Sequence, residues 1–132
     1  KTVTVKDYYG QKEEDRELFD AGISISSFEH DGLGKYGDPL DPWGDIKAMK
    51  RMKSTIKKGG ILYLAIPVGL DRIDWNAHRV YGNERLPYLL DGWKTLETYK
   101  LTEEVLKITP FDPLEEKDGY GYRHCLFVLE NV

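Results

Sequence analysis

The sequence lacks the hallmarks of several protein classes. Its 132 residues include one cysteine, Cys125, which excludes an internal disulfide and a zinc site built from several cysteines. A single cysteine also agrees with a reducing compartment, so we expect a cytoplasmic protein. No apolar run approaches the roughly 20 residues that cross a bilayer. The 19 basic and 23 acidic residues are interspersed, without a basic stripe or a cationic amphipathic face. We therefore expect neither nucleic acid nor membrane as a partner, and a small polar molecule fits the charge balance better.

Apolar residues are plentiful enough for a folded core. Hydrophobic residues make up 40% of the chain and aromatic residues 12%, which predicts one globular domain over residues 1–132. The chain starts at Lys1 rather than at a methionine and enters an apparent strand at Val3–Lys6 at once. We therefore expect an upstream portion of the protein to be missing from these residues.

The first half of the chain predicts a strand, a helix and a second strand. Alternation over residues 21–28 places Ile23 and Ile25 on one face and small serines on the other, where a helix could pack closely. Asp41 is a suitable N-cap for a helix that starts at Pro42 and runs to about residue 57, where Gly59 and Gly60 would end it. The continuous apolar segment 61–66, ILYLAI, is typical of a parallel strand covered on both faces.

The second half predicts further elements of both kinds. We expect a short helix at 83–90, strands at 93–101 and 122–130, and a helical segment at 102–107. The fold class is therefore α/β, with a mixed sheet that has a parallel core and an antiparallel pair of strands at its C-terminal end.

Two loops rich in titratable side chains follow the two central strands. Glu29 and His30 close the first strand, and either could act as a general base, because imidazole titrates near neutrality and burial raises the pKa of a carboxyl group. Alternation would leave only one of the two facing the crevice, and Glu29 could instead cap the glycine-rich turn. The carboxyl ends of parallel strands lie at one edge of a sheet, so both loops should share one crevice there.

The second loop offers binding groups. His78 could transfer a proton, and Arg79 could grip a carboxylate or phosphate with two hydrogen bonds. The alternative is that Arg79 pairs with Asp31 or Asp38 and locks the loops together. We assign Glu29, His30 and His78 as candidate catalytic residues. The candidate substrate-binding residues are Asp38, Asn76, Arg79 and Tyr81.

The glycine-rich loop contains a motif that could mislead. Gly32, Gly34 and Gly37 spell G-x-G-x-x-G, but Pro39 and Pro42 prevent a helix from starting where a dinucleotide-binding loop needs one. We interpret these glycines as positive-φ loop positions, and Asp38 equally as a turn residue. Glu29, His30, Asp38 and His78 could bind zinc, manganese or iron, but their spacing matches no metal motif, so we assign no metal ligand.

Several unusual strings together resemble a known family. They are SISSFEHDGLGKYGDPLDPWGD, KKGGILYLAIPVG, NAHRVYG and RLPYLLDGW. These strings resemble the domain-of-unknown-function family named for Caenorhabditis proteins, number two hundred and sixty-eight, whose members look like class I S-adenosylmethionine-dependent methyltransferases. The resemblance implies a Rossmann-like sheet in which residues 21–28 form the fourth strand and the strand after Lys-Lys-Gly-Gly the fifth. The last two strands would form the antiparallel end.

The resemblance also implies what this chain lacks. The glycine-rich turn and the acidic residue that hold S-adenosylmethionine in the family have no counterpart here, so no cofactor-binding residue is assigned. We expect the C-terminal part of a methyltransferase-like domain that does not bind the cofactor alone. The 21–28 strand would keep a free edge for a missing N-terminal segment or a second chain. A non-catalytic module that binds a small molecule or partner, and a metal-dependent hydrolase, are the alternative functions.

Overall fold

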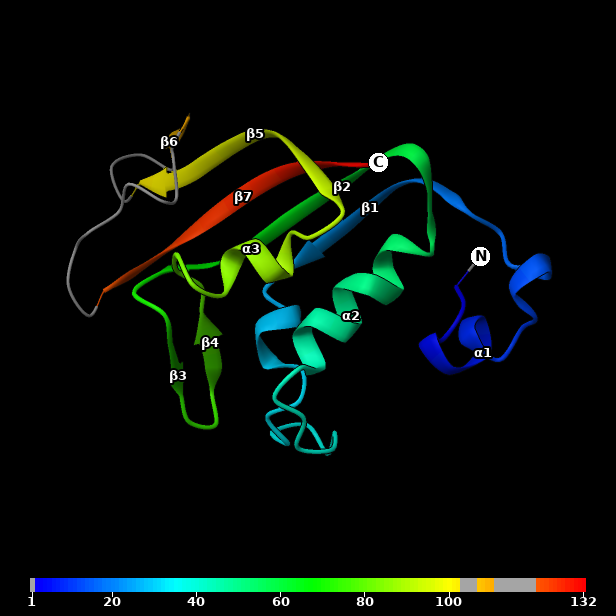
Figure 1. Cartoon of the computed structure of the whole chain (residues 1–132), viewed down its shortest axis with the longest axis horizontal. Coiled ribbons are helices and arrows are strands. Elements are labelled where there is room, and N and C mark those ends of the chain that lie inside the picture. Colours follow the sequence, from blue (N-terminus) through cyan, green and yellow to red (C-terminus); the bar gives the residue numbers. More distant parts are fainter. Residues whose placement is uncertain (1, 103–106, 111–120) are drawn as a thin grey trace.

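The computed structural model describes residues 2–102, 107–110 and 121–132. Within them the chain forms a five-stranded mixed sheet with helices on one side (Figure 1). The helices are α1 (Val5–Tyr9), α2 (Gly44–Lys53) and α3 (Leu86–Leu89), with single 3-10 turns η1 (Glu13–Asp15) and η2 (Phe28–His30). The strands are β1 (Phe19–Ile25), β2 (Ile56–Gly69), β3 (Arg72–Asp74), β4 (His78–Val80), β5 (Trp93–Thr102), β6 (Lys107–Pro110) and β7 (Tyr122–Asn131).

The order of strands in the sheet is β1-β2-β7-β5-β6. β1 and β2 are parallel and are joined through α2, while β7 is antiparallel to both β2 and β5. The expected parallel core with an antiparallel pair at the C-terminal end is thus present. A separate antiparallel ribbon, β3–β4, projects from the end of β2 beside η2 (Figure 1).

One hydrophobic core fills the space between the sheet and the helices. Alternate residues of β2 and β7 point into it, and α2 and α3 close it from the other side. Its members include Leu62, Leu64, Ile66, Phe127, Leu129, Met49 and Leu89, all at most 1% exposed. At about 25 cal/mol for each Å² of apolar surface buried, this layer supplies most of the driving force for folding.

The opposite face of the sheet is open. Ile23 and Ile25 of β1 are 70% and 71% exposed, whereas Ser24 on the other face is buried. The expectation that a helix covers the serine face is therefore met, since Gly22 on that face lies against Met52 of α2. The expectation that β2 is covered on both faces is wrong for the described residues, because Tyr63 on the open face is 40% exposed.

Two predicted elements differ at the N-terminal side. Residues 3–6 were expected to be a strand, but Val5–Tyr9 is helical, because the Thr4 side chain accepts a hydrogen bond from the backbone N–H of Asp7 and caps the helix. α2 begins at Gly44 rather than Pro42, because the Asp41 carboxylate accepts the N–H of Trp43 and first forms a turn.

The end of α2 also differs from the prediction. The helix stops at Lys53 and β2 already begins at Ile56, so residues 57–60 belong to the strand. The pairing with β1 is irregular here: Phe19 lies opposite Ile56, and Ala21 lies opposite Ile61. Gly59, with φ 79°, provides the backbone conformation that this bulge needs.

The remaining predictions agree better with the structure. The strands expected at 93–101 and 122–130 correspond to β5 and β7, and the helix expected at 83–90 is present as the shorter α3. The helical segment expected at 102–107 lies largely outside the described residues, and β6 follows from Lys107. No helix in the described part of the chain is long and apolar enough to span a membrane.

Candidate functional site

A sharp turn at the end of β1 positions the first candidate residues. β1 ends at Ile25, and Ser26 adopts a positive φ of 47°, a rare conformation for a residue with a side chain. The chain then forms the turn η2, which carries Glu29 and His30. Our expectation that these two residues close a strand and point to opposite faces is therefore wrong, and their side chains lie next to each other.

Glu29 is completely buried behind this turn. Its Oε1 accepts a hydrogen bond from Ser26 Oγ at 2.6 Å, while Oε2 has no hydrogen-bond partner among the described residues. The carboxylate therefore holds the positive-φ turn in place. One of our alternatives was that Glu29 caps the glycine-rich loop, and in the structure no hydrogen bond of this kind is present among the described residues.

His30 connects the two loops. Its Nδ1 lies 2.6 Å from the carbonyl oxygen of Ala77, in the turn between β3 and β4, and its Nε2 lies 3.7 Å from Glu29 Oε1. A carbonyl oxygen only accepts hydrogen bonds, so Nδ1 carries a proton here. Both nitrogens of His30 thus face groups of the protein.

His78 completes a cluster of rings at the same end of the sheet. The ring centroids of His30 and His78 are 6.3 Å apart, and the ring of Tyr122 on β7 lies 5.1 Å from His78. His124 follows at 5.8 Å from Tyr122. The structure therefore brings together Glu29, His30 and His78, and adds two residues that our sequence reasoning did not select.

His78 has an acidic neighbour behind it. Its Nε2 is buried and lies 3.4 Å from Oδ2 of Asp74, directly opposite on the β3–β4 ribbon, but makes no hydrogen bond within the described residues. Arg72 donates from Nε to the same carboxylate at 3.0 Å and fixes its position. Among the described contacts no hydrogen bond engages Nδ1 of His78, and the side chain is 19% exposed. A strand pairing of this kind could not be foreseen from sequence spacing.

Asp38 organises the glycine-rich loop. Its carboxylate accepts the backbone N–H groups of Gly32, Gly34 and Tyr36 at 2.6, 3.3 and 3.3 Å. Burial pushes the pKa of Asp38 upward, but these backbone hydrogen bonds outweigh it and the pKa is lowered. The three glycines of the motif have positive φ, as we predicted. This position supports a turn role for Asp38 more than a substrate contact.

Arg79 is 1% exposed and joins both loops from within. Its guanidinium donates to the carbonyl oxygens of Asp31 and Asp41 at 2.5 and 3.3 Å, and Nε lies 3.7 Å from the carboxylate of Asp45. The arrangement supports the locking role, with backbone carbonyls and Asp45 as partners instead of the side chains of Asp31 or Asp38. The guanidinium is therefore not accessible to a ligand from the surface.

Asp45 is the centre of a buried polar network. It accepts hydrogen bonds from Tyr81 Oη at 3.0 Å and from Nε and Nη2 of Arg85 at 2.9 and 2.6 Å. Burial and the adjacent Asp45 carboxylate raise the pKa of Tyr81 well above its usual range. The hydrogen bond to Asp45 likewise raises the pKa of Arg85. Tyr81 is completely buried, so its contacts are internal, whereas Asn76 is exposed in the β3–β4 turn.

The glycine-rich loop does not have the geometry of a cofactor-binding glycine loop. A cofactor-binding glycine loop must offer open backbone, but here a Cβ at Gly32 would lie 2.1 Å from the carbonyl oxygen of Asp41, and Asp38 takes the amides. Across the described residues no group of three or more histidine, cysteine or acidic side chains is arranged to hold a metal ion.

These observations define a mixed α/β domain with a polar, ring-lined cluster where its parallel strands end. The chain belongs to the family described as Caenorhabditis protein of unknown function, DUF268, whose model matches residues 1–131. No curated protein matches the chain, and no solved structure matches it. The family match extends beyond the strings from which we inferred it and includes the N-terminal helix and the last strand.

Proposed function

We propose that this chain is the acceptor-binding part of a class I methyltransferase-like domain. A small polar molecule would bind where β1 and β2 end, between η2 and the β3–β4 ribbon. The observation that carries the proposal is the meeting of the two polar loops at one edge of the sheet, with the His30 and His78 rings 6.3 Å apart.

The arrangement of strands supports the same assignment. The resemblance implies two parallel strands joined by a helix, followed by a terminal antiparallel pair. β1 and β2 with α2, and then β5 and β7, have this arrangement. A fold alone does not define an activity, so the proposal depends on the site residues as well.

The contacts favour His78 as the proton-accepting residue. The Asp74 carboxylate lies 3.4 Å from Nε2 without a hydrogen bond in this structure, and we propose that in the working site it orients the ring with its proton on Nε2, so that Nδ1 is the acceptor. His30 has both nitrogens directed at protein groups and, with Glu29, holds the turn beside His78. Deprotonation of an acceptor hydroxyl or amine by His78 would raise its nucleophilicity.

The described residues do not form a cofactor-binding glycine loop. We propose that S-adenosylmethionine, if the intact protein uses it, binds through residues outside this chain. Calorimetric titration of S-adenosylmethionine should give no saturable binding to residues 1–132 and saturable binding to the full-length natural protein. Absence of binding to both would refute the methyltransferase assignment.

The role of His78 has its own test. In the natural protein, His78→Gln should lower kcat for transfer of a labelled methyl group at least tenfold, while His124→Gln, in the same ring cluster, should leave kcat within twofold. Asp74→Asn should lower kcat with little change in KM, since Asp74 acts through His78. Equal effects of His78→Gln and His124→Gln would contradict the assignment.

A non-catalytic binding module is the second candidate function. The observation that favours it is the locked state of the site, where Arg79 and Tyr81 are buried in internal contacts and Nδ1 of His30 is bonded to the Ala77 carbonyl oxygen. Such a module predicts that a ligand binds without turnover and that His78→Gln weakens binding. A metal-dependent hydrolase has no supporting geometry among the described residues.

A further inference from the structure

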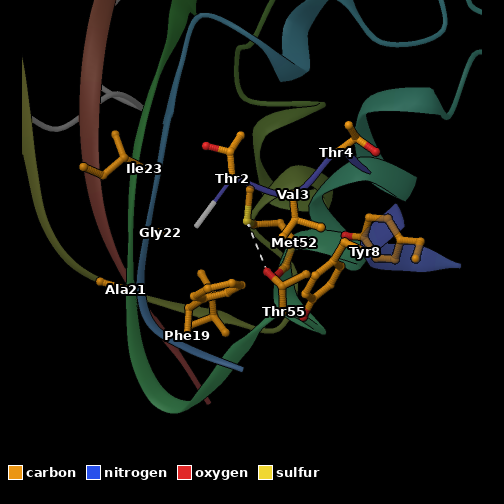
Figure 2. A pocket seen from close by; sticks show the side chains of 12 residues that line it. Thr2, Val3, Thr4, Tyr8, Phe19, Ala21, Gly22, Ile23, Met52 and Thr55 are labelled. Carbon is orange, nitrogen blue, oxygen red and sulfur yellow. Dashed lines mark hydrogen bonds between the residues drawn. The ribbon is translucent and has the colours of Figure 1, made fainter. Parts of the chain in front are cut away.

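Two cavities of the described structure contain residues of α2 and differ in chemistry. The larger, of about 480 Å³, lies between β1 and the N-terminal segment, and its walls include Val3, Tyr8, Phe19 and Ile23 (Figure 2). β1 has no strand on this outer side in the described strand order, and the N-terminal segment flanks it without pairing. None of the described residues that line this cavity is charged, so nothing in it would fix a polar ligand.

The smaller cavity, of about 220 Å³, lies between α2 and the loop that precedes it. Gly44, Lys47 and Arg51 line it from α2, and their spacing of three and four residues places them on one face of the helix. The loop contributes the other lining residues, which are Asp31, Gly32, Asp38, Pro39 and Asp41. Charged side chains of both signs therefore line one small space.

Most of these charges are already compensated by the protein. Asp38 accepts three backbone N–H groups, as described above. Asp41 binds Nζ of Lys47 at 2.6 Å and also accepts the N–H of Trp43 at 2.9 Å. Asp31 and Arg51 remain as the charged side chains of this cavity that make no hydrogen bond or ion pair within the described residues.

Asp31 and Arg51 sense each other across the cavity. The carboxylate of Asp31 is half-buried, and burial raises its pKa, because a charge removed from water without a partner is unfavourable. The strongest opposing effect on this pKa is the positive charge of Arg51, which lowers it. The two groups are thus near each other without forming an ion pair, and the hydrogen-bonding capacity of both is unused.

This pattern restricts the ligand. One uncompensated negative and one uncompensated positive charge favour a molecule that carries both signs, because a ligand with a single charge would leave the other group without a partner. The cavity is smaller than the roughly 300–1,000 Å³ of pockets for drug-sized ligands, so the molecule is small. Arginine binds a carboxylate with two parallel hydrogen bonds, and a carboxylate in turn binds an ammonium group.

We propose that this cavity is a binding site for an α-amino acid, whose ammonium group pairs with Asp31 and whose carboxylate pairs with Arg51. Lys47 keeps two of its three N–H donors after it binds Asp41, and it supports the carboxylate end. None of the lining residues belongs to the ring cluster of His30 and His78. The proposal therefore does not rest on the proposed function.

Three probes of similar size test the need for both charges. Alanine carries both, propionate lacks the ammonium group, and isopropylamine lacks the carboxylate. Saturation-transfer difference NMR detects weak ligands at low micromolar protein concentration. We expect saturable binding of alanine at millimolar concentration and at least tenfold weaker binding of the other two. Absence of alanine binding, or equal binding of alanine and either of the other probes, would overturn the proposal.

Variants with matched controls locate the site. Asp31→Asn and Arg51→Gln should each weaken alanine binding at least tenfold. Asp20→Asn and Lys50→Gln change exposed charges outside the cavity and should leave binding unchanged. Asp31 has no partner among the described residues, so Asp31→Asn should melt no lower than the wild type, which separates loss of binding from loss of folding. Alanine binding that survives Asp31→Asn but is lost in His78→Gln would assign alanine to the proposed acceptor site and overturn this inference.

Discussion

Replacing Asp45 by asparagine is the most direct test of what holds the two loops together. The carboxylate is fully buried and accepts three hydrogen bonds, two of them from Arg85. In Asp45→Asn the side chain keeps its shape but loses its charge, and its NH₂ group faces a donor. Arg85, whose side chain is 24% exposed, can recover water, but Arg79 at 1% cannot.

The expected cost follows from that uncompensated guanidinium. Breaking a buried ion pair by removing one partner costs about 3–5 kcal/mol. A stable domain has about 5–15 kcal/mol in total, so the variant would lose a large fraction of its stability. With a urea m-value of about 1.5 kcal/mol/M, a loss of about 3 kcal/mol lowers the unfolding midpoint by roughly 2 M. Fluorescence of the three tryptophans reports the transition.

The control removes the charge of an exposed carboxylate instead of a buried one. Asp20 pairs with Lys57 at the surface, and its side chain is 88% exposed. Asp20→Asn should cost at most about 1 kcal/mol. If Asp45→Asn does not fold, Asp45→Asn combined with Arg79→Met should restore folding, because the buried positive charge is then removed. The reasoning is refuted if Asp45→Asn and Asp20→Asn shift the midpoint equally, or if the double variant is less stable than Asp45→Asn.

Two further predictions concern the glycine-rich loop. The lowered pKa of Asp38 means that its stabilising contribution is present above the unfolded-state pKa of about 3.9 and is lost as the pH falls below it toward the folded-state pKa. Urea midpoints between pH 5 and 3 should therefore fall less steeply in Asp38→Asn than in the wild type, and parallel curves would argue against the loop contacts. Gly44→Ala should cost about 1–3 kcal/mol, because its Cβ would lie 2.8 Å from the carbonyl oxygen of Asp31. Thermal melts measure this loss. In them Gly121→Ala, whose Cβ would meet nothing within 4 Å, should leave the melting temperature unchanged.

Much of the framework could be predicted from the sequence because it depends on local patterns. The alternation at 21–28 and the apolar run at 61–66 predicted the parallel pair, which pairs from Ala21 to Ile25 in the structure. The short alternation at residues 3–6 misled us, because a threonine followed three residues later by aspartate is also the pattern of a capped helix. The glycine pair at 59–60 marked a bulge inside β2 and not a helix end.

The candidate site was predictable only in its location. The rule that loops after parallel strands share one edge placed Glu29, His30 and His78 together, and the ring distances agree. The partners of each side chain depend on how the loops pack, which no spacing reveals. Two examples of partners that only the structure reveals are Asp74 beside His78, and Asp45 beside the buried Arg79.

The open face of the sheet has a practical consequence for every experiment described above. Ile23 and Tyr63 lie side by side in the register of β1 and β2, and Val128 continues the row on β7. Because Ile23 is 70% and Tyr63 40% exposed, we expect this row to promote self-association in water and to bind hydrophobic resins and reporter dyes. Binding measurements should therefore be made at low micromolar concentration, with light scattering recorded alongside, so that aggregation is not mistaken for recognition.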